Sequence, residues 1–361
     1  MQEALNFFCL FILYSVPGTS GQILCPDSTE ILPCTCSQDV IDRTVNVDCS
    51  EANSSDEIHY PFNDVDWPFQ NLTRFLLKEN NDVSVLPEGV FGDISFEEIF
   101  VDLTSVTSLH FTTLLPSKDR LWSLIIGFSS LEEFPWEILP QLINLKELDL
   151  QFNALTSLPL LQSASLEYID IMFNEISHVE AGWSLPNLRI LNLNSNPVSD
   201  VPTGFFSDMG KLEEFLCFSC ALGPTLSTKS LEFRSATFKR IVISSNSIST
   251  LDVDAITGLQ PNTRLSFRDN EIRELTEVLF RPMLDVLSVD TGHMDIVGNP
   301  VKCDCSIAWV VLNPSFLGSV FGVCTDGTNF QDLDPIIFED CARSEPTLVD
   351  DYSTWIDSRM K

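Results

Sequence analysis

The chain has 361 residues, of which 52 are Asp or Glu and 20 are Lys or Arg, so its formal net charge at pH 7 is -32. With 44% hydrophobic residues it has enough apolar material for a large core, which excludes a wholly disordered protein. Its charge argues against nucleic acid as a ligand and against docking on anionic lipid, because few cations are available to meet phosphates. The same acidity favours a basic partner.

An apolar run near the N-terminus predicts export. Residues 5–16 read LNFFCLFILYSV, and small residues follow at 18–21. This pattern indicates a signal peptide over residues 1–20. A membrane anchor is the alternative, but the run is too short to span about 30 Å of hydrocarbon. Ten of the 11 cysteines then remain, and an even number in a secreted chain predicts disulfides. We therefore expect a free, secreted, extracellular protein with no membrane span.

A repeated pattern organises the rest of the chain. The template has apolar residues at positions 1, 4, 6 and 11 and Asn at position 9. Clear copies begin at Leu145, Leu166, Leu188 and Phe238, and weaker copies begin at Leu72, Phe96, Leu121, Leu212 and Asn262. This is the leucine-rich repeat signature. Because positions 4 and 6 point to the same side of a strand, successive strands can bury them together in a parallel sheet. We predict an α/β-type solenoid, a leucine-rich repeat horseshoe with a parallel concave sheet and about nine repeats.

Position 9 predicts an inward ladder of polar side chains that satisfy the backbone of neighbouring turns. Its members are Asn80, Thr104, Ser129, Asn153, Asn174, Asn196, Cys220, Asn246, Asn270 and Asn299. We also expect Phe91, Phe206 and Phe280 to pack in the core on the returning side of their repeats.

Two groups of four cysteines flank the repeats and predict caps, since an open array exposes its core at both ends. The first group is Cys25, Cys34, Cys36 and Cys49, and the second is Cys303, Cys305, Cys324 and Cys341. Each group allows three pairings, and zinc is the alternative to disulfides, although the Cys-x-Cys spacing suits zinc poorly. We expect Trp309 to close the last repeat.

The resulting organisation has five parts: a signal peptide (1–20), an N-terminal cysteine cap (21–71), repeats (72–293), a C-terminal cysteine cap (294–341) and an acidic tail (342–361). Within the repeats, Cys217 and Cys220 form a CxxC motif at positions 6 and 9. Both face the core, so we expect two buried thiols, with an internal disulfide as the alternative.

No catalytic motif is present: GxSxG, HExxH, a P-loop and GxGxxG are all missing, and we predict no catalytic residues, no cofactor and no metal site. The segment 326–334, DGTNFQDLD, has several oxygen donors but lacks EF-hand spacing, so calcium is a weak alternative. Sequons at Asn53 and Asn71 predict glycosylation.

The concave face suggests where a partner binds. Position 8 carries Phe128, Phe152 and Phe173 in three successive repeats, with Trp122 nearby. Strands stack about 4.8 Å apart, so the rings should form a row. Acidic residues alternate with them, namely Glu97, Glu98, Asp102, Glu147, Asp149, Glu167 and Asp170. Exposed apolar groups among carboxylates mark an interaction site; the alternative is that position 8 packs half-buried against the following loop.

The C-terminal part carries a more specific resemblance. FRPML at 280–284 leads into NPVKCDCSIAWVVLNP at 299–314, followed by CTDGT at 324–328 and DLDP at 332–335. These motifs resemble secreted arthropod leucine-rich repeat proteins similar to the oplophorus-luciferin 2-monooxygenase non-catalytic subunit. Resemblance to capped extracellular repeat proteins implies the pairs Cys25–Cys36, Cys34–Cys49, Cys303–Cys324 and Cys305–Cys341.

The resemblance also implies a non-catalytic binding or stabilising role. Our first hypothesis is a secreted protein that presents its concave sheet to a protein partner, which would be basic. The second is a non-catalytic stabilising subunit of a secreted luciferase-like monooxygenase complex, with a small catalytic subunit as its partner. The third is an enzyme in its own right.

Overall fold

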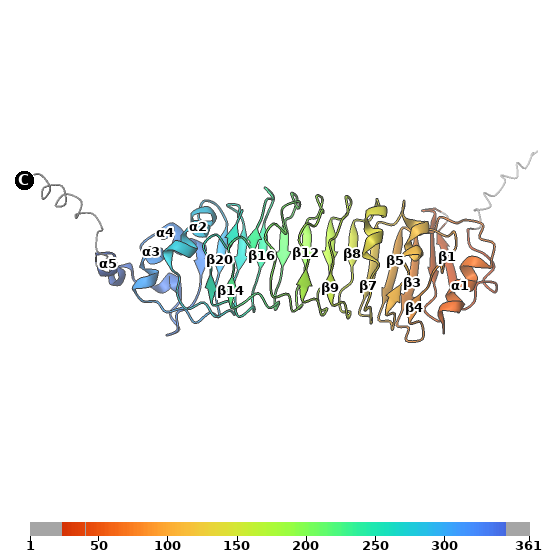
Figure 1. Ribbon diagram of the computed structural model, residues 1–361, viewed down its shortest axis with the longest axis horizontal. Helices are drawn as coiled ribbons and strands as arrows, with labels where there is room; N and C mark the ends of the chain where they lie inside the picture. The colour runs from red at the N-terminus through yellow and green to blue at the C-terminus, as the bar shows by residue number, and fades with distance from the viewer. Residues whose placement is uncertain (1–23, 40, 344–361) are drawn as a thin grey trace, which may run out of the picture.

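The computed structural model describes residues 24–39 and 41–343 as one long stack of repeats with a cap at each end (Figure 1). The expected signal peptide at 1–20 and all but the first two residues of the expected tail lie outside the described residues. No helix in the described part of the chain is long and apolar enough to cross a membrane.

Thirteen strands of the described residues form one sheet along the length of the stack. β1 and β2 pair antiparallel, and every later neighbour pairs parallel. In spatial order the strands are β1 (Thr35–Asp39), β2 (Thr44–Asp48), β3 (Arg74–Lys78), β5 (Glu98–Asp102), β7 (Ser123–Gly127), β8 (Glu147–Asp149), β10 (Tyr168–Asp170), β12 (Ile190–Asn192), β13 (Glu214–Leu216), β16 (Arg240–Val242), β19 (Arg264–Ser266), β20 (His293–Asp295) and β21 (Val320–Phe321).

The return paths of the repeats are mostly short strands and turns. The two-stranded sheets are β4 (Val85–Leu86) with β6 (Ser108–Leu109), β9 (Ser157–Leu158) with β11 (His178–Val179), β14 (Thr225–Leu226) with β17 (Thr250–Leu251), and β15 (Leu231–Glu232) with β18 (Ile256–Thr257). The 3₁₀ helices are η1 (Phe111–Ser117), η2 (Trp136–Gln141), η3 (Cys305–Ile307) and η4 (Phe330–Asp332). The α-helices lie toward the ends of the stack: α1 (Ser55–Asn63), α2 (Glu277–Leu287), α3 (Ala308–Val311), α4 (Pro314–Ser319) and α5 (Pro335–Arg343).

The core follows the repeat template. The position 4 and position 6 residues Leu148 and Leu150 are fully buried, as are their counterparts Leu191 and Leu193 two repeats later. Phenylalanines fill the return side of some repeats, where Phe91, Phe206 and Phe280 are each 1% exposed, as predicted. They belong to separate ring clusters; Phe91 lies 4.7 Å from Phe75, and Phe206 lies 5.0 Å from Phe215, between centroids.

The position 9 ladder joins each repeat to its neighbour. Asn174 Nδ2 donates to Leu150 O of the preceding repeat at 2.9 Å, and its Oδ1 accepts the N–H of Leu155 at 3.0 Å. Such bonds satisfy buried backbone groups that water cannot reach. Where Asn is replaced by Thr104 and Ser129, the two hydroxyls bond to one another at 2.7 Å.

Disulfides hold both caps. The structure pairs Cys25 with Cys36, Cys34 with Cys49, Cys303 with Cys324 and Cys305 with Cys341, which are the pairs that the resemblance implies. Trp309 is half-buried at the C-terminal end, where its Nε1 donates to Leu275 O at 2.8 Å. Burying the open end of the array in this way replaces contacts that a further repeat would otherwise make.

The CxxC motif differs from our expectation of two free thiols, which is wrong: Cys217 and Cys220 form a fifth disulfide. Both side chains turn inward from positions 6 and 9, and their Cα atoms are 5.5 Å apart, within the disulfide range of about 4.4–6.8 Å. A disulfide sulfur has no hydrogen to donate, so the 3.5 Å between Cys220 Sγ and Leu193 O is only a contact.

Candidate functional site

Phe128, Phe152 and Phe173 stack in one column, which we call the aromatic row. The ring centroids of Phe128 and Phe152 are 4.3 Å apart and their planes meet at 12°, and Phe152 and Phe173 repeat the same geometry. Phe128 is 44% exposed and Phe173 is 47% exposed, while Phe152 between them is half-buried. The row is thus a continuous apolar surface open to solvent along two of its rings.

The backbone fixes where the aromatic row lies. Phe128, Phe152 and Phe173 have φ of 45°, 53° and 52°, and each donates its N–H to the neighbouring repeat. The same left-handed conformation occurs with Ser195 and Ser245 at position 8 of other repeats, so it belongs to the repeat and does not explain a phenylalanine. β7, β8 and β10 end before these residues. The row therefore follows one edge of the sheet, whereas the sequence analysis expected it on the concave face.

Leu103 extends the aromatic row by one repeat. It occupies position 8 of the preceding repeat with φ of 54° and is 49% exposed. On the other side Ser195 takes this position and ends the apolar run. Sequence reasoning missed Leu103, although the template starting at Phe96 places it in line.

Trp122 is exposed but lies apart from the aromatic row. It is 40% exposed and directly precedes β7, whereas Phe128 directly follows that strand. A five-residue strand is about 17 Å long, so the structure does not bring Trp122 and the row together. Its carbonyl instead accepts the N–H groups of Lys146 and Glu147.

Two of the carboxylates expected to surround the row are buried. Asp149 and Asp170 face one another in register on β8 and β10 and are 8% and 5% exposed. Burial, with a smaller contribution from the charge of Asp170 beside it, raises the pKa of Asp149 to about 6. Tyr168 donates its hydroxyl to Asp170 at 2.8 Å, and burial raises the pKa of this phenol too. Asp149 and Asp170 are therefore buried within the protein and do not form an acidic surface around the aromatic row.

Other carboxylates of this set are in ion pairs. Glu97 pairs with Arg120, Glu98 with Arg74, and Glu167 with Lys146. The acidic surround that the sequence predicts is therefore weaker on the open face of the sheet than the residue types alone indicate.

A hollow of about 1000 Å³ lies next to the aromatic row. Its walls include the rings of His110, Phe111, Phe134 and Trp136 and the carboxylates Glu132, Glu133, Glu137 and Glu175. The four glutamates are exposed, and no lysine or arginine is among the lining residues. Glu175 follows Phe173 by two residues, so the row and the hollow adjoin along the same edge of the stack.

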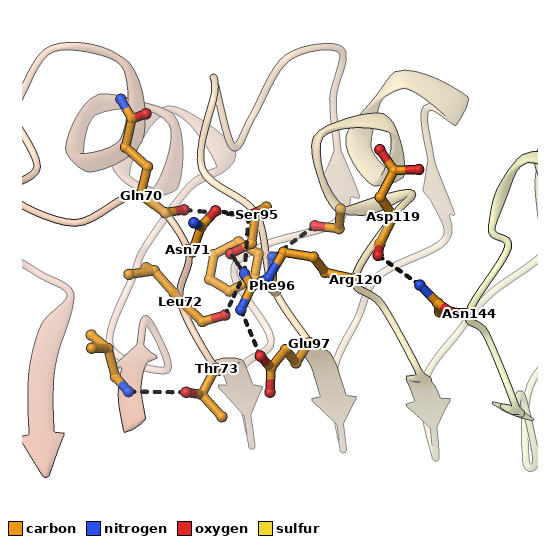
Figure 2. Close-up of polar contacts among 12 residues, drawn as sticks. Gln70, Asn71, Leu72, Thr73, Ser95, Phe96, Glu97, Asp119, Arg120 and Asn144 are labelled. Carbon is orange, nitrogen blue, oxygen red and sulfur yellow. Dashed lines mark hydrogen bonds and ion pairs between the residues drawn. The ribbon is translucent and has the colours of Figure 1, made fainter. Parts of the chain in front are cut away.

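Arg120 fastens three repeats at the N-terminal end of the sheet (Figure 2). Its Nη1 donates to Leu72 O and Ser95 O at 3.1 Å each, and its Nη2 donates to Glu97 Oε1 at 2.6 Å. A planar guanidinium has enough donors to serve several acceptors at once. No sequence pattern predicts this role, because Arg120 donates to backbone carbonyls, which every residue type carries.

Both sequon asparagines are exposed. Asn71 Oδ1 accepts from Ser95 Oγ at 3.0 Å (Figure 2). Asn53 Nδ2 donates to Glu57 Oε2 at 3.2 Å in front of α1. Their surface positions leave glycosylation a prediction.

The C-terminal loop around Asp326 forms a turn. Asp326 Oδ1 accepts the N–H of Thr328 at 2.9 Å, which lowers the pKa of this carboxyl. Residues 24–39 and 41–343 contain no group of three or more His, Cys, Asp or Glu placed to hold a metal ion.

Stacked parallel strands, an asparagine ladder and cysteine caps define a leucine-rich repeat protein with a horseshoe fold. No protein-family model matches the chain. It is similar to the oplophorus-luciferin 2-monooxygenase non-catalytic subunit of Oplophorus gracilirostris, with 26% identity over 325 residues that cover 88% of each chain. Podocan of Mus musculus is 34% identical over 140 residues, 37% of this chain and 22% of podocan.

Solved structures agree on the fold. A chain of the octameric complex of latrophilin 3, Unc5D and the leucine-rich repeats of FLRT2 superposes with a TM-score of 0.58. The match covers 75% of this chain and 83% of that one at 19% identity.

Proposed function

We propose that this is a secreted, non-catalytic leucine-rich repeat protein that binds a protein partner through the aromatic row. The observation that carries the proposal is the stack of three phenylalanines, two of them more than two-fifths exposed. Aromatic rings lose little side-chain entropy on binding and dominate interface energies when a partner covers them. The five disulfides of the described residues support an oxidising, extracellular setting.

The partner that suits this surface is basic at its contact. The hollow beside the row combines four exposed glutamates with aromatic walls, a setting that attracts lysine and arginine side chains by charge and by cation–π contact. The net charge of -32 would also speed the approach of such a partner at low ionic strength.

Capture from the tissue that secretes the protein tests the proposal. Wild type, Phe152→Ala and the control Tyr60→Ala, which removes a 50% exposed ring on α1, are immobilised and compared. Replacing Phe152 should weaken partner binding by about 1–3 kcal/mol, and replacing Tyr60 should not. A partner retained equally by all three proteins would place the interface elsewhere.

A second proposal is a stabilising subunit of a luciferase-like monooxygenase complex. The observation that favours it is similarity, along 88% of both chains, to a protein named as such a non-catalytic subunit. The purified chain is assayed for oplophorus-luciferin oxidation alone and with the catalytic subunit of that relative. Activity only in the mixture, or a longer-lived catalytic subunit, supports it; activity of the chain alone would indicate an enzyme.

A further inference from the structure

Cations gather in one part of the open face of the sheet, although acidic residues outnumber basic ones in the chain by 52 to 20. The cluster comprises Lys239 and Arg240 of the β16 repeat and Arg264 and Arg268 of the β19 repeat, and the ring of His293 on β20 lies beside it. We call the cluster and this ring the basic strip.

The register of the strands brings two cations together. Arg240 is opposite Arg264, and Arg264 is in turn opposite the ring of His293. Side chains directly opposite one another on neighbouring strands are close, and like charges in this arrangement are destabilising. Packing does not explain the arrangement either, because Arg240 and Arg264 are exposed.

Not all of this positive charge is compensated within the protein. Arg240 Nη1 is 3.4 Å from Glu214, Arg268 Nη1 is 2.8 Å from Asp295, and Lys239 Nζ is 2.5 Å from Glu213. Arg264, in the middle, has no ion-pair partner among the described residues. Its guanidinium therefore offers free donors to a ligand.

The basic strip lines a hollow of about 870 Å³ on the open face, and the wall of this hollow also contains the carboxylates Glu214, Asp269 and Asp295. Phe218 is also in its wall and is 42% exposed. Phe321 is 40% exposed on β21, and its ring centroid lies 5.4 Å from that of His293. Exposed rings thus lie on two sides of the unpaired arginine.

We propose that the basic strip binds an acidic polypeptide segment with carboxylates at Arg264 and Arg240 and apolar side chains at Phe218 and Phe321. The strip covers three strands, or about 10 Å across the sheet, which is too wide for one small anion to span. Two exposed rings favour a ligand with apolar groups between its charges, which a polypeptide has and a sulfated glycan lacks. This site goes beyond the aromatic row and does not depend on it.

Fluorescence anisotropy with the full chain tests the proposal. The probe is a labelled peptide in which glutamates alternate with leucines, and the salt concentration is about 0.15 M, where repulsion from distant surface charges is screened within about 8 Å. Arg264→Ala should lower the affinity for the peptide about two- to fivefold, and Arg264→Glu should lower this affinity further. Arg234→Ala removes an exposed arginine paired with Glu232 outside the strip and should bind like wild type, as should Phe152→Ala.

Unchanged binding by Arg264→Glu, or equal losses in the Arg234→Ala control, would overturn the proposal. So would a strip that binds a heparin oligosaccharide or inorganic sulfate but not the peptide. If Arg264→Glu fails to fold, Arg240→Gln provides the same comparison with a milder change. If Phe152→Ala binds the peptide like wild type, the basic strip is supported as a separate site, whether or not the aromatic row binds a partner.

Discussion

The ring of Phe152 lies between those of Phe128 and Phe173, with 4.3 Å between centroids on each side. Its neighbours therefore cover both faces of the central ring, while the outer rings remain open to solvent. This geometry lies between the two alternatives that the sequence left open, an exposed contact row and a half-buried packing element.

Removing the central ring should cost stability, but less than removing a core ring. Offset or stacked aromatic pairs contribute about 0.5–1.5 kcal/mol beyond burial, so we expect Phe152→Ala to lower the free energy of unfolding by about 1–2 kcal/mol. The fully buried Phe206 is the matched control, and Phe206→Ala should cost about 3–5 kcal/mol. Urea titration of both variants measures the difference. Equal losses would show that the aromatic row is part of the core.

Asp149 should make stability depend on pH. Its folded-state pKa, raised to about 6 by burial, lies above the value of about 3.9 for Asp in an unfolded chain. The folded state thus holds the proton more tightly, and this contribution to stability is complete below about pH 4 and lost as the pH rises through about 6.

Asp149→Asn should therefore match wild type near pH 4 and be more stable by about 1–2 kcal/mol near pH 7.5. Thermal melts across this range compare it with Asp200→Asn, which changes an exposed carboxylate. A difference from wild type that stays constant with pH would show that the titration of Asp149 does not control stability.

Arg120 should be important for the N-terminal repeats. Hydrogen bonds from a charged donor contribute about 1.5–3 kcal/mol, and this side chain donates to Leu72 O, Ser95 O and Glu97. We expect Arg120→Ala to lower the free energy of unfolding by about 2–3 kcal/mol and to speed amide exchange around β3 and β5. Arg234→Ala is the exposed control. Unchanged amide exchange near β3 would contradict the proposal that Arg120 stabilises the N-terminal repeats.

The repeat template predicts the fold well because its spacing is regular and local. Positions 4 and 6 of successive copies are buried in the structure, as Leu148 and Leu150 show, and the Asn174 amide makes the ladder bonds. The aromatic row was predictable for the same reason, since position 8 recurs at each repeat.

The sequence does not predict features that depend on the distance between residues at different template positions or on the register of neighbouring strands. Trp122 and Phe128 are six residues apart in sequence, and only the length of β7 shows that they lie at opposite ends of a strand. Arg264 stands out only once the register places it between Arg240 and His293. Sequence reasoning also treated Asp149 as surface charge, because its residue type says nothing about its burial.

The Cys217–Cys220 disulfide replaces an asparagine of the ladder at position 9. Its contribution to the free energy of unfolding can therefore be compared with that of a ladder asparagine at the same position. Peptide mapping under non-reducing conditions should find five disulfides and no free thiol in the secreted chain. A loop closed over three residues constrains the unfolded chain by about 2 kcal/mol, compared with about 4 kcal/mol for the 36-residue separation of Cys305 and Cys341. Replacing Cys217 and Cys220 by alanines should therefore lower the free energy of unfolding less than replacing Cys305 and Cys341 by alanines.

A ladder-restoring variant should recover about half of the smaller loss. In the double variant Cys217→Leu/Cys220→Asn, the new amide can donate to Leu193 O, as Asn174 does toward Leu150 O, while the N–H of Val198 already donates to Asn196 O. One hydrogen bond of about 1 kcal/mol would offset about half of the lost cross-link. We therefore expect this variant to unfold within about 1 kcal/mol of wild type, and the double alanine variant to be less stable. If both variants lose the same free energy of unfolding, position 9 of this repeat does not act through the ladder.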